Sequence, residues 1–208
     1  MRFIIAEAVS VITYLLLVFL VGNGSELEIG FARFVVPLVI VIFLWAWMRW
    51  VENSSIAVLD LIDWRRICTG LFGGIVLGAV PPVVIWLFLP KGPPNSTEPL
   101  GLFMWSLVTA ALVMQAFPEE IVFRGWLMEV TKTTPWRSLT WTTVAFTIIH
   151  LISQNGQETI TDYLVVLISP LSFGLLCGAL VLYLHNVWWA IGVHTGWHLA
   201  HGMFSWAP

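Results

Sequence analysis

The sequence predicts an all-α protein: a polytopic transmembrane helix bundle of about seven spanning helices, forming one domain over residues 1–208. The first observation is composition, because 59% of the residues are hydrophobic and 10% are charged, whereas a soluble domain carries about 25% charged residues. The second is that the apolar residues gather in segments of about 20, the length that crosses a bilayer core. We therefore expect a multi-pass protein of the cell membrane, surrounded by lipid.

Seven apolar segments follow one another along the chain. The first follows Arg2, as in a signal peptide, but its length and the lack of a small-residue cleavage site favour a retained helix. The third ends at Pro90, before the turn-rich residues 91–96. The expected spanning helices are 3–22, 31–50, 68–90, 102–131, 138–153, 161–184 and 187–205.

The loop charges predict the orientation of the bundle. Arg49, Arg65 and Arg66 flank the loop between the second and third segments, and Lys132 and Arg137 flank the loop between the fourth and fifth. The loop between the first and second segments and the loop between the fifth and sixth are acidic, whereas Lys91 in the loop between the third and fourth is a minor exception. Since basic residues collect on the cytoplasmic side of a membrane protein, the N-terminus is expected in the cytoplasm and the C-terminus outside.

The net charge argues against a nucleic-acid partner, and the cysteine spacing argues against a disulfide or a zinc site. The net charge is −3 and no basic face is evident, so nucleic acid is not an expected partner. Cys68 and Cys177 both fall within predicted spanning helices and lack disulfide or zinc-site spacing.

Two adjacent carboxylates and an arginine lie within the fourth apolar segment. Ionisable groups are expensive in hydrocarbon, so Glu119, Glu120 and Arg124 indicate a functional site. Pro118 cannot donate to the carbonyl of Met114, so the helix is expected to kink and admit water there. Adjacent helical residues point about 100° apart, so one glutamate faces a cavity while Glu120 meets Arg124 at i,i+4. A purely structural salt bridge is the alternative.

Histidines mark two further helices. Phe146 and His150 are i,i+4 neighbours, whereas His194, His198 and His201 form one stripe at i, i+4 and i+7. His150 could also be a packing residue, and the stripe could be a metal site, a set of hydrogen-bond donors or a polar seam between helices. Counting about 1.5 Å per residue from one interface places Glu119, His150 and His198 about 18 Å deep, and His194 about 12 Å deep. The similar depths support a shared site.

Three motifs in this order resemble a known family. They are Glu119-Glu120-x-x-x-Arg124, Phe146-x-x-x-His150 and His194-x-x-x-His198, all within the predicted helices of residues 102–205. They are similar to the motifs of the CAAX protease and bacteriocin-processing family, abbreviated CPBP and also called Abi. The resemblance implies an intramembrane protease whose cavity is reached from the cytoplasmic side.

The resemblance also implies the role of each matching residue. Glu119 would be the general base and His150 its partner in activating water, while His194 and His198 would stabilise the oxyanion. Glu120, Arg124 and Phe146 would support the site. The family often has asparagine where this chain has His198; a neutral imidazole can donate a hydrogen bond as an amide does, but it is also a better metal ligand.

The expected function is therefore an intramembrane endopeptidase, in which a glutamate- and histidine-activated water hydrolyses a peptide bond near the membrane. Its expected substrate is a hydrophobic peptide or a lipidated protein, and no cofactor is expected. A second version of the enzyme holds zinc at Glu119, His150, His194 and His198. A non-enzymatic alternative is a non-catalytic member of the same family that acts in bacteriocin self-immunity.

Overall fold

The computed structural model describes residues 26–59, 61–88, 99–131, 134–153 and 159–206, together with Ala8. All secondary structure in these ranges is helical. The elements are α2 (Glu26–Trp50), the 3₁₀-helix η1 (Ile56–Leu59), α3 (Trp64–Phe88), α4 (Leu100–Val108), the π-helix η2 (Thr109–Ala116), α5 (Phe117–Glu120), the π-helix η3 (Ile121–Leu127), α6 (Met128–Val130), α7 (Pro135–Ser153), α8 (Ile160–Leu184) and α9 (Val187–Trp206).

The predicted helices from the second onward are confirmed with small shifts at their ends. The largest difference is at α2, which begins at Glu26 rather than at residue 31. The fourth predicted helix corresponds to the uninterrupted run from α4 to α6. The first, at 3–22, lies outside the described residues apart from Ala8.

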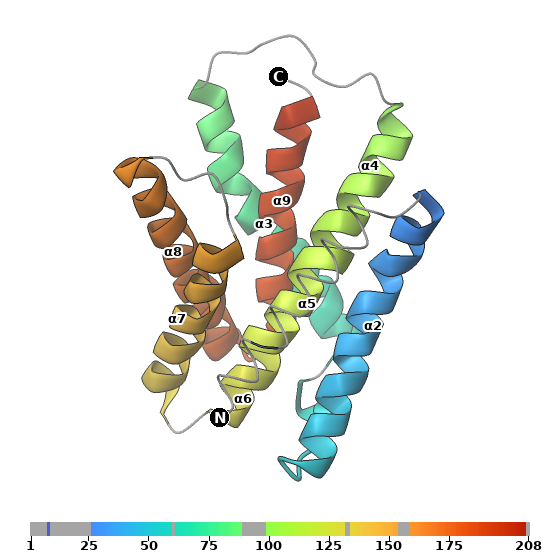
Figure 1. Ribbon diagram of the computed structural model, residues 1–208, viewed down its shortest axis with the longest axis vertical. Coiled ribbons are helices and arrows are strands. Elements are labelled where there is room, and N and C mark those ends of the chain that lie inside the picture. Colours follow the sequence, from blue (N-terminus) through green and yellow to red (C-terminus); the bar gives the residue numbers. More distant parts are fainter. Residues whose placement is uncertain are drawn as a thin grey trace.

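The helices form a bundle in which successive passes alternate in direction (Figure 1). The run from α4 to α6 crosses the bundle diagonally, with α2 on one side and α7 and α8 on the other. Helix α9 contacts α3, α8 and the α4–α6 run, so it occupies the centre of the bundle. This central place matters because α9 carries the third motif.

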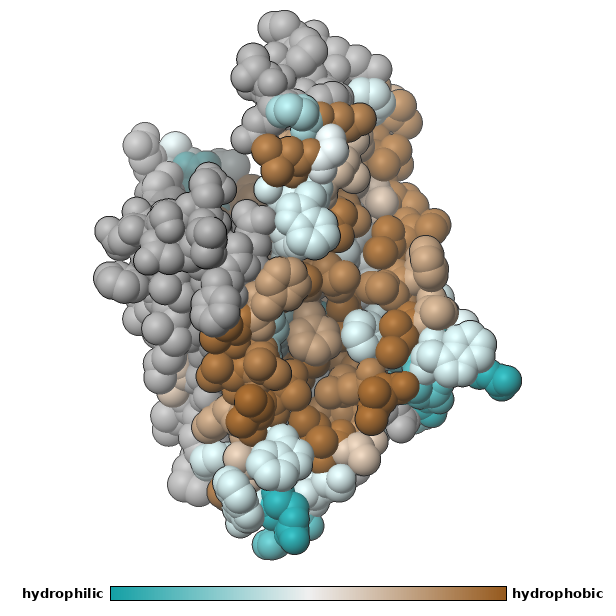
Figure 2. Space-filling model, turned by 90° about the vertical axis from the view of Figure 1, so that its right-hand side faces the viewer, coloured by the Kyte–Doolittle hydropathy of each residue, from teal (hydrophilic) through white to brown (hydrophobic). Residues whose placement is uncertain are grey.

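Three helices are long and apolar enough to cross a membrane: Trp64–Phe88, Leu100–Val130 and Ile160–Leu184. A shorter apolar helix covers Phe34–Trp50. Large apolar side chains are exposed on the outside of the bundle, including Leu38 and Phe72. Figure 2 shows one face whose middle is covered by apolar side chains and whose lower end is hydrophilic. These features indicate a membrane protein, but they do not confirm the count of seven spans.

Glycines allow α3 and α9 to approach closely. Gly70, Gly74 and Gly78 recur every four residues on α3 and are buried. A Cβ atom added to Gly74 would lie 2.6 Å from the Trp189 carbonyl oxygen and 2.7 Å from the Gly192 Cα. Small residues at this spacing let two membrane helices pack backbone against backbone.

The glycine contact also orients the histidines of α9. Gly192 and Gly196 both face α3. On an α-helix, residues two positions apart point about 200° apart. His194 lies two positions from each of these glycines, and His198 two from Gly196, so both imidazoles point away from α3. They face the α4–α6 run and α8 instead.

We expect Gly74→Ala to destabilise the protein, because the added methyl group would meet backbone atoms of α9 that cannot move independently. Overpacking of this kind costs about 1–3 kcal/mol, more than the roughly 1 kcal/mol that alanine gains over glycine in a helix. Thermal unfolding in detergent micelles would measure the loss. Gly101→Ala is the matched control, because nothing lies within 4 Å of its Cβ position. Equal unfolding temperatures for the two variants would contradict the packing argument.

Candidate active site

The first motif lies where the α4–α6 run departs from regular α-helix. Pro118 stands in the short α5 segment, between the π-helices η2 and η3. Because proline has no N–H, it interrupts the regular hydrogen bonding of the preceding turn. Stretches of π-helix within an α-helix are frequently found at functional sites. A kink that admits water was predicted at Pro118; the structure has π-helical turns on both sides of Glu119 and Glu120.

Glu120 and Arg124 form a buried ion pair, as their i,i+4 spacing predicts. Arg124 Nη1 lies 3.1 Å from Glu120 Oε2 and 3.2 Å from Oε1, and both side chains are fully buried. His194, from α9, adds a second contact to the same carboxylate, with Nδ1 2.8 Å from Oε1. Since a carboxylate accepts hydrogen bonds, His194 Nδ1 carries the proton and donates it.

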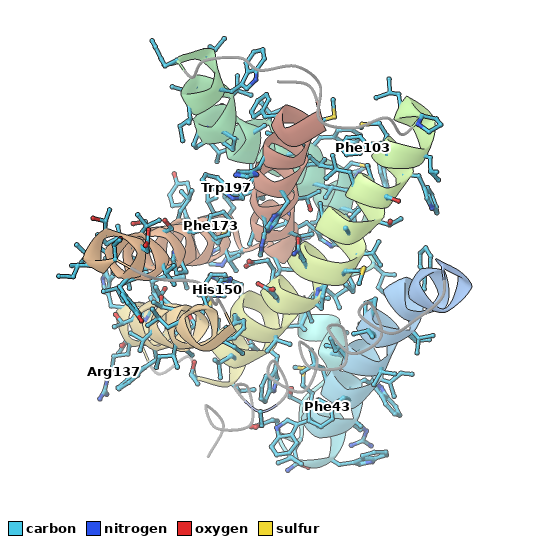
Figure 3. The ribbon with its side chains drawn as sticks, turned by 45° about the horizontal axis from the view of Figure 1, so that its top comes forward. Phe43, Phe103, Arg137, His150, Phe173 and Trp197 are labelled. Atoms are coloured by element: carbon cyan, nitrogen blue, oxygen red, sulfur yellow. The ribbon has the colours of Figure 1, made fainter. Side chains whose placement is uncertain are left out.

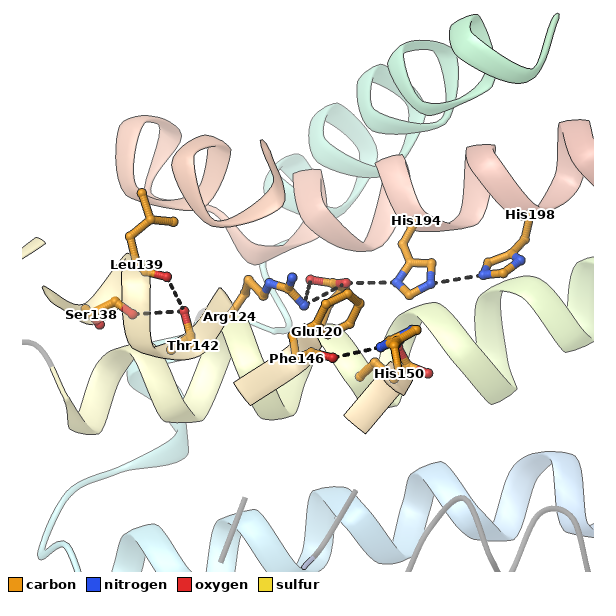
Figure 4. A network of polar contacts seen from close by, with 10 residues as sticks. Glu120, Arg124, Ser138, Leu139, Thr142, Phe146, His150, His194 and His198 are labelled. Carbon is orange, nitrogen blue, oxygen red and sulfur yellow. Dashed lines mark hydrogen bonds and ion pairs between the residues drawn. The ribbon is translucent and has the colours of Figure 1, made fainter. Parts of the chain in front are cut away.

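The hydrogen bonds continue from His194 to His198. The two Nε2 atoms are 3.0 Å apart, and the rings stack with centroids 4.9 Å apart. In neutral His194 the proton is on Nδ1, so Nε2 accepts the N–H of His198. Arg124, Glu120, His194 and His198 therefore form one continuous chain of polar contacts (Figure 4).

Glu119 takes a separate partner on α7. Its Oε2 lies 4.0 Å from His150 Nε2, and the side chains are 33% and 22% exposed. His150 Nδ1 lies 2.8 Å from the carbonyl oxygen of Phe146. A carbonyl can only accept, so Nδ1 holds the proton and neutral His150 presents the lone pair of Nε2 to the carboxylate. The more accessible glutamate thus faces an imidazole acceptor.

The Phe146 ring lies between these two polar groups. The Arg124 guanidinium carbon is 4.0 Å from its centroid, a cation–π contact. The ring centroid of His150, which is also on α7, lies 4.2 Å from that of Phe146. The ring centroid of His194, on α9, lies 6.4 Å from that of Phe146. The Phe146 side chain is 1% exposed. It therefore separates the buried ion pair from the His150 side of the site with a rigid apolar ring.

Phe173 on α8 is a neighbour that the sequence motifs do not identify. Its ring packs edge-on against His194 at 5.0 Å and also contacts Phe146 and Trp197. Figure 3 shows Phe173 between the labelled His150 and Trp197 side chains. The sequence carries one signal beside it, because small residues of α8 recur at helical spacing, and the structure buries them: Gly174, Cys177 and Gly178.

Gly174 leaves room for the arginine. A Cβ atom there would lie 3.2 Å from Arg124 Nη2 and 3.0 Å from the Thr143 side chain. This close approach explains how a guanidinium fits between α7 and α8 with almost no solvent contact. His201, the last member of the predicted stripe, is exposed, so α9 contributes His194 and His198 to the site but not His201.

The predicted residues therefore come together as two adjoining groups. One is the Glu119–His150 pair, and the other is the chain of Glu120, Arg124, His194 and His198, with Phe146 between them. Across the described ranges, no three His, Cys, Asp or Glu side chains are placed to hold a metal ion.

Residues 101–200 match the model of a family described as type II CAAX prenyl endopeptidase Rce1-like. The matched range contains all seven residues of the three motifs, and it confirms the family resemblance of the sequence. No curated protein and no solved structure gives a significant match to the chain.

Removing either member of the Glu120–Arg124 pair should strongly destabilise the fold, because the other charge would remain buried without its partner. Glu120→Gln and Arg124→Met are each expected to cost about 3–5 kcal/mol. The double variant should lose less than the sum of the two, since neither charge remains. Denaturant unfolding in mixed micelles would give the coupling energy. Strictly additive losses would show that the two side chains stabilise the protein independently.

Proposed function

We propose that this chain is an intramembrane endopeptidase that cleaves a peptide bond near the membrane, because residues 101–200 match the model of the type II CAAX prenyl endopeptidase Rce1-like family. The proposed nucleophile is a water molecule activated by Glu119 and His150. A metal-independent reaction follows from this choice of groups.

The observation that carries the proposal is the spacing of Glu119 Oε2 and His150 Nε2. At 4.0 Å they are too far apart for a direct hydrogen bond. Both are acceptors when His150 is neutral, so a water molecule that donates one O–H to each would bridge them. Such a water has its oxygen lone pairs directed away from both groups and toward an incoming substrate.

Hydrolysis then needs one proton to move twice. As the water oxygen attacks the carbonyl carbon, the Glu119 carboxylate takes a proton from it. The C–N bond breaks when the tetrahedral intermediate collapses, and Glu119 returns that proton to the leaving amine. The products are a carboxylic acid and an amine, and Glu119 is again a carboxylate. His150 orients the water throughout and holds its second proton in place.

The buried chain of polar contacts supports this chemistry. The ion pair of Glu120 with Arg124 fixes the helix turn that presents Glu119, and His194 is held against Glu120 through Nδ1–H. His198 lies at the half-buried end of the chain. In the proposed reaction its Nε2–H leaves His194 and donates to the oxyanion, because catalytic hydrogen bonds often form only in the substrate complex.

The proposed substrate is a hydrophobic peptide or a lipidated protein, because these reach a site surrounded by spanning helices. The proposed location is the cell membrane. The end of the bundle that carries Arg49, Arg65, Arg66 and Arg137 is assigned to the cytoplasmic side by its basic residues. Nucleic acid is not a proposed partner.

Glu119→Gln should abolish cleavage without unfolding the protein, because the amide keeps the shape of the side chain but cannot accept a proton. A fall of at least about 10³-fold in kcat is expected, the upper part of the range for general acid–base catalysis combined with water positioning. A quenched fluorescent peptide ending in a prenylated CAAX sequence, in detergent or proteoliposomes, would report the rate. Glu129→Gln on the same helical run is the matched control. Wild-type activity in Glu119→Gln would remove the proposed mechanism.

Chelators should leave the activity within about twofold of the untreated enzyme, because the proposed steps use only side-chain protons. The measurement is the cleavage rate after incubation with a strong zinc chelator and dialysis. Loss of activity that added zinc restores would instead support the zinc version of the enzyme.

A further inference from the structure

Gln115 is a polar residue that none of the three motifs includes. It lies in the π-helix η2, at the middle of the candidate span Leu100–Val130, with 15 residues on either side. Its side chain is exposed, and it makes no hydrogen bond to any described residue. A polar group at the centre of a membrane span is costly on a lipid-facing surface and normally faces the interior or a water-filled space.

The helix places Gln115 on the same side as Glu119. The two residues are four positions apart, so their side chains project from one face at successive turns. Glu119 is one-third exposed there and points toward His150. Gln115 thus lies about one turn away from the proposed nucleophile, toward the Leu100 end of the run.

The register between α9 and the α4–α6 run brings His198 to the same level. The two helices contact each other and run in opposite directions (Figure 1). Glu120 and His194 are in contact, which fixes one matching level. Four residues from His194 toward the C-terminal end of α9 is His198. Four residues from Glu120 toward the Leu100 end of the α4–α6 run is Ala116, which is adjacent to Gln115.

One of the two expected oxyanion donors, His194, already donates its N–H within the site. His194 was expected to stabilise the oxyanion, yet its N–H is directed to the Glu120 carboxylate and its other nitrogen accepts from His198. Of the two histidines, only His198 can donate to substrate while both are neutral. The amide of Gln115 has two N–H donors and one acceptor, all without a protein partner in the described structure.

We propose that Gln115 is a catalytic residue of this site, whose side-chain amide donates a hydrogen bond to the carbonyl oxygen of the scissile peptide bond. It acts together with His198, which approaches the same oxygen from α9. This inference rests on the proposed endopeptidase function and adds to it the second oxyanion donor that His194 does not supply.

Substitution of Gln115 by leucine tests the proposal, because leucine has similar bulk, suits a helix in lipid and cannot donate. With the prenylated fluorescent peptide, kcat should fall about 10²-fold, the lower end of the loss seen when one oxyanion donor is removed. KM should change much less, because the bond strengthens as negative charge develops. Gln115→Asn, which keeps a shorter amide, should recover part of the rate. Leu102→Ala, at an exposed apolar position of the same run, is the control.

A folding defect is separated from a catalytic one by the unfolding temperature, which should match the wild type in Gln115→Leu. Unchanged kcat in a folded Gln115→Leu protein overturns the inference and leaves the Glu119 mechanism intact. If the wild-type protein does not cleave this peptide, the proposal is tested by binding instead. In the Glu119→Gln background, a peptide with a reduced, tetrahedral hydroxyl isostere should bind at least tenfold more weakly when Gln115 is leucine. Equal affinity, or no binding by either protein, overturns it.

Discussion

The structure depends on one requirement: a carboxylate buried inside an apolar helix bundle must be neutralised and hydrogen-bonded. Glu120 meets it with Arg124 on its own helix and His194 on α9, and all three side chains are buried. Leaving one of these charges without its partner would cost about 3–5 kcal/mol, a large part of the stability of a typical folded domain. The ion pair and its histidine therefore couple the first motif to the third, and they fix where the second must pack.

The neighbouring glutamate is free for a different task because of helix geometry. Successive residues point about 100° apart, so Glu119 cannot share the buried partners of Glu120. It reaches a more exposed position and faces His150. One residue step along the chain thus separates a buried, ion-paired carboxylate from the more exposed carboxylate that we propose as the base, and π-helical turns lie on both sides of them.

Small and aromatic residues determine the remaining distances. The glycines of α3 and α9 bring those helices into backbone contact, which turns the α9 imidazoles toward the α4–α6 run. Phe146 and Phe173 then fill the space between the imidazoles of His150 and His194. Rigid rings at these contacts keep the polar groups at fixed separations while water is kept away from the ion pair.

The sequence by itself predicted the helical class, the six segments that appear as helices from Glu26 onward, the resemblance to the family whose model matches residues 101–200, and the polar residues that the structure brings together. Apolar run length and i,i+4 spacing are local properties, so these features could be read without a fold. The pairing of Glu120 with Arg124 was also predicted from the sequence, because it follows from i,i+4 spacing. Only the tertiary structure decided that His194 joins Glu120 rather than Glu119, that Phe173 supports His194, and that Gln115 lies level with His198. Those contacts join different helices, and their register follows from how glycines and rings pack, which no single segment encodes.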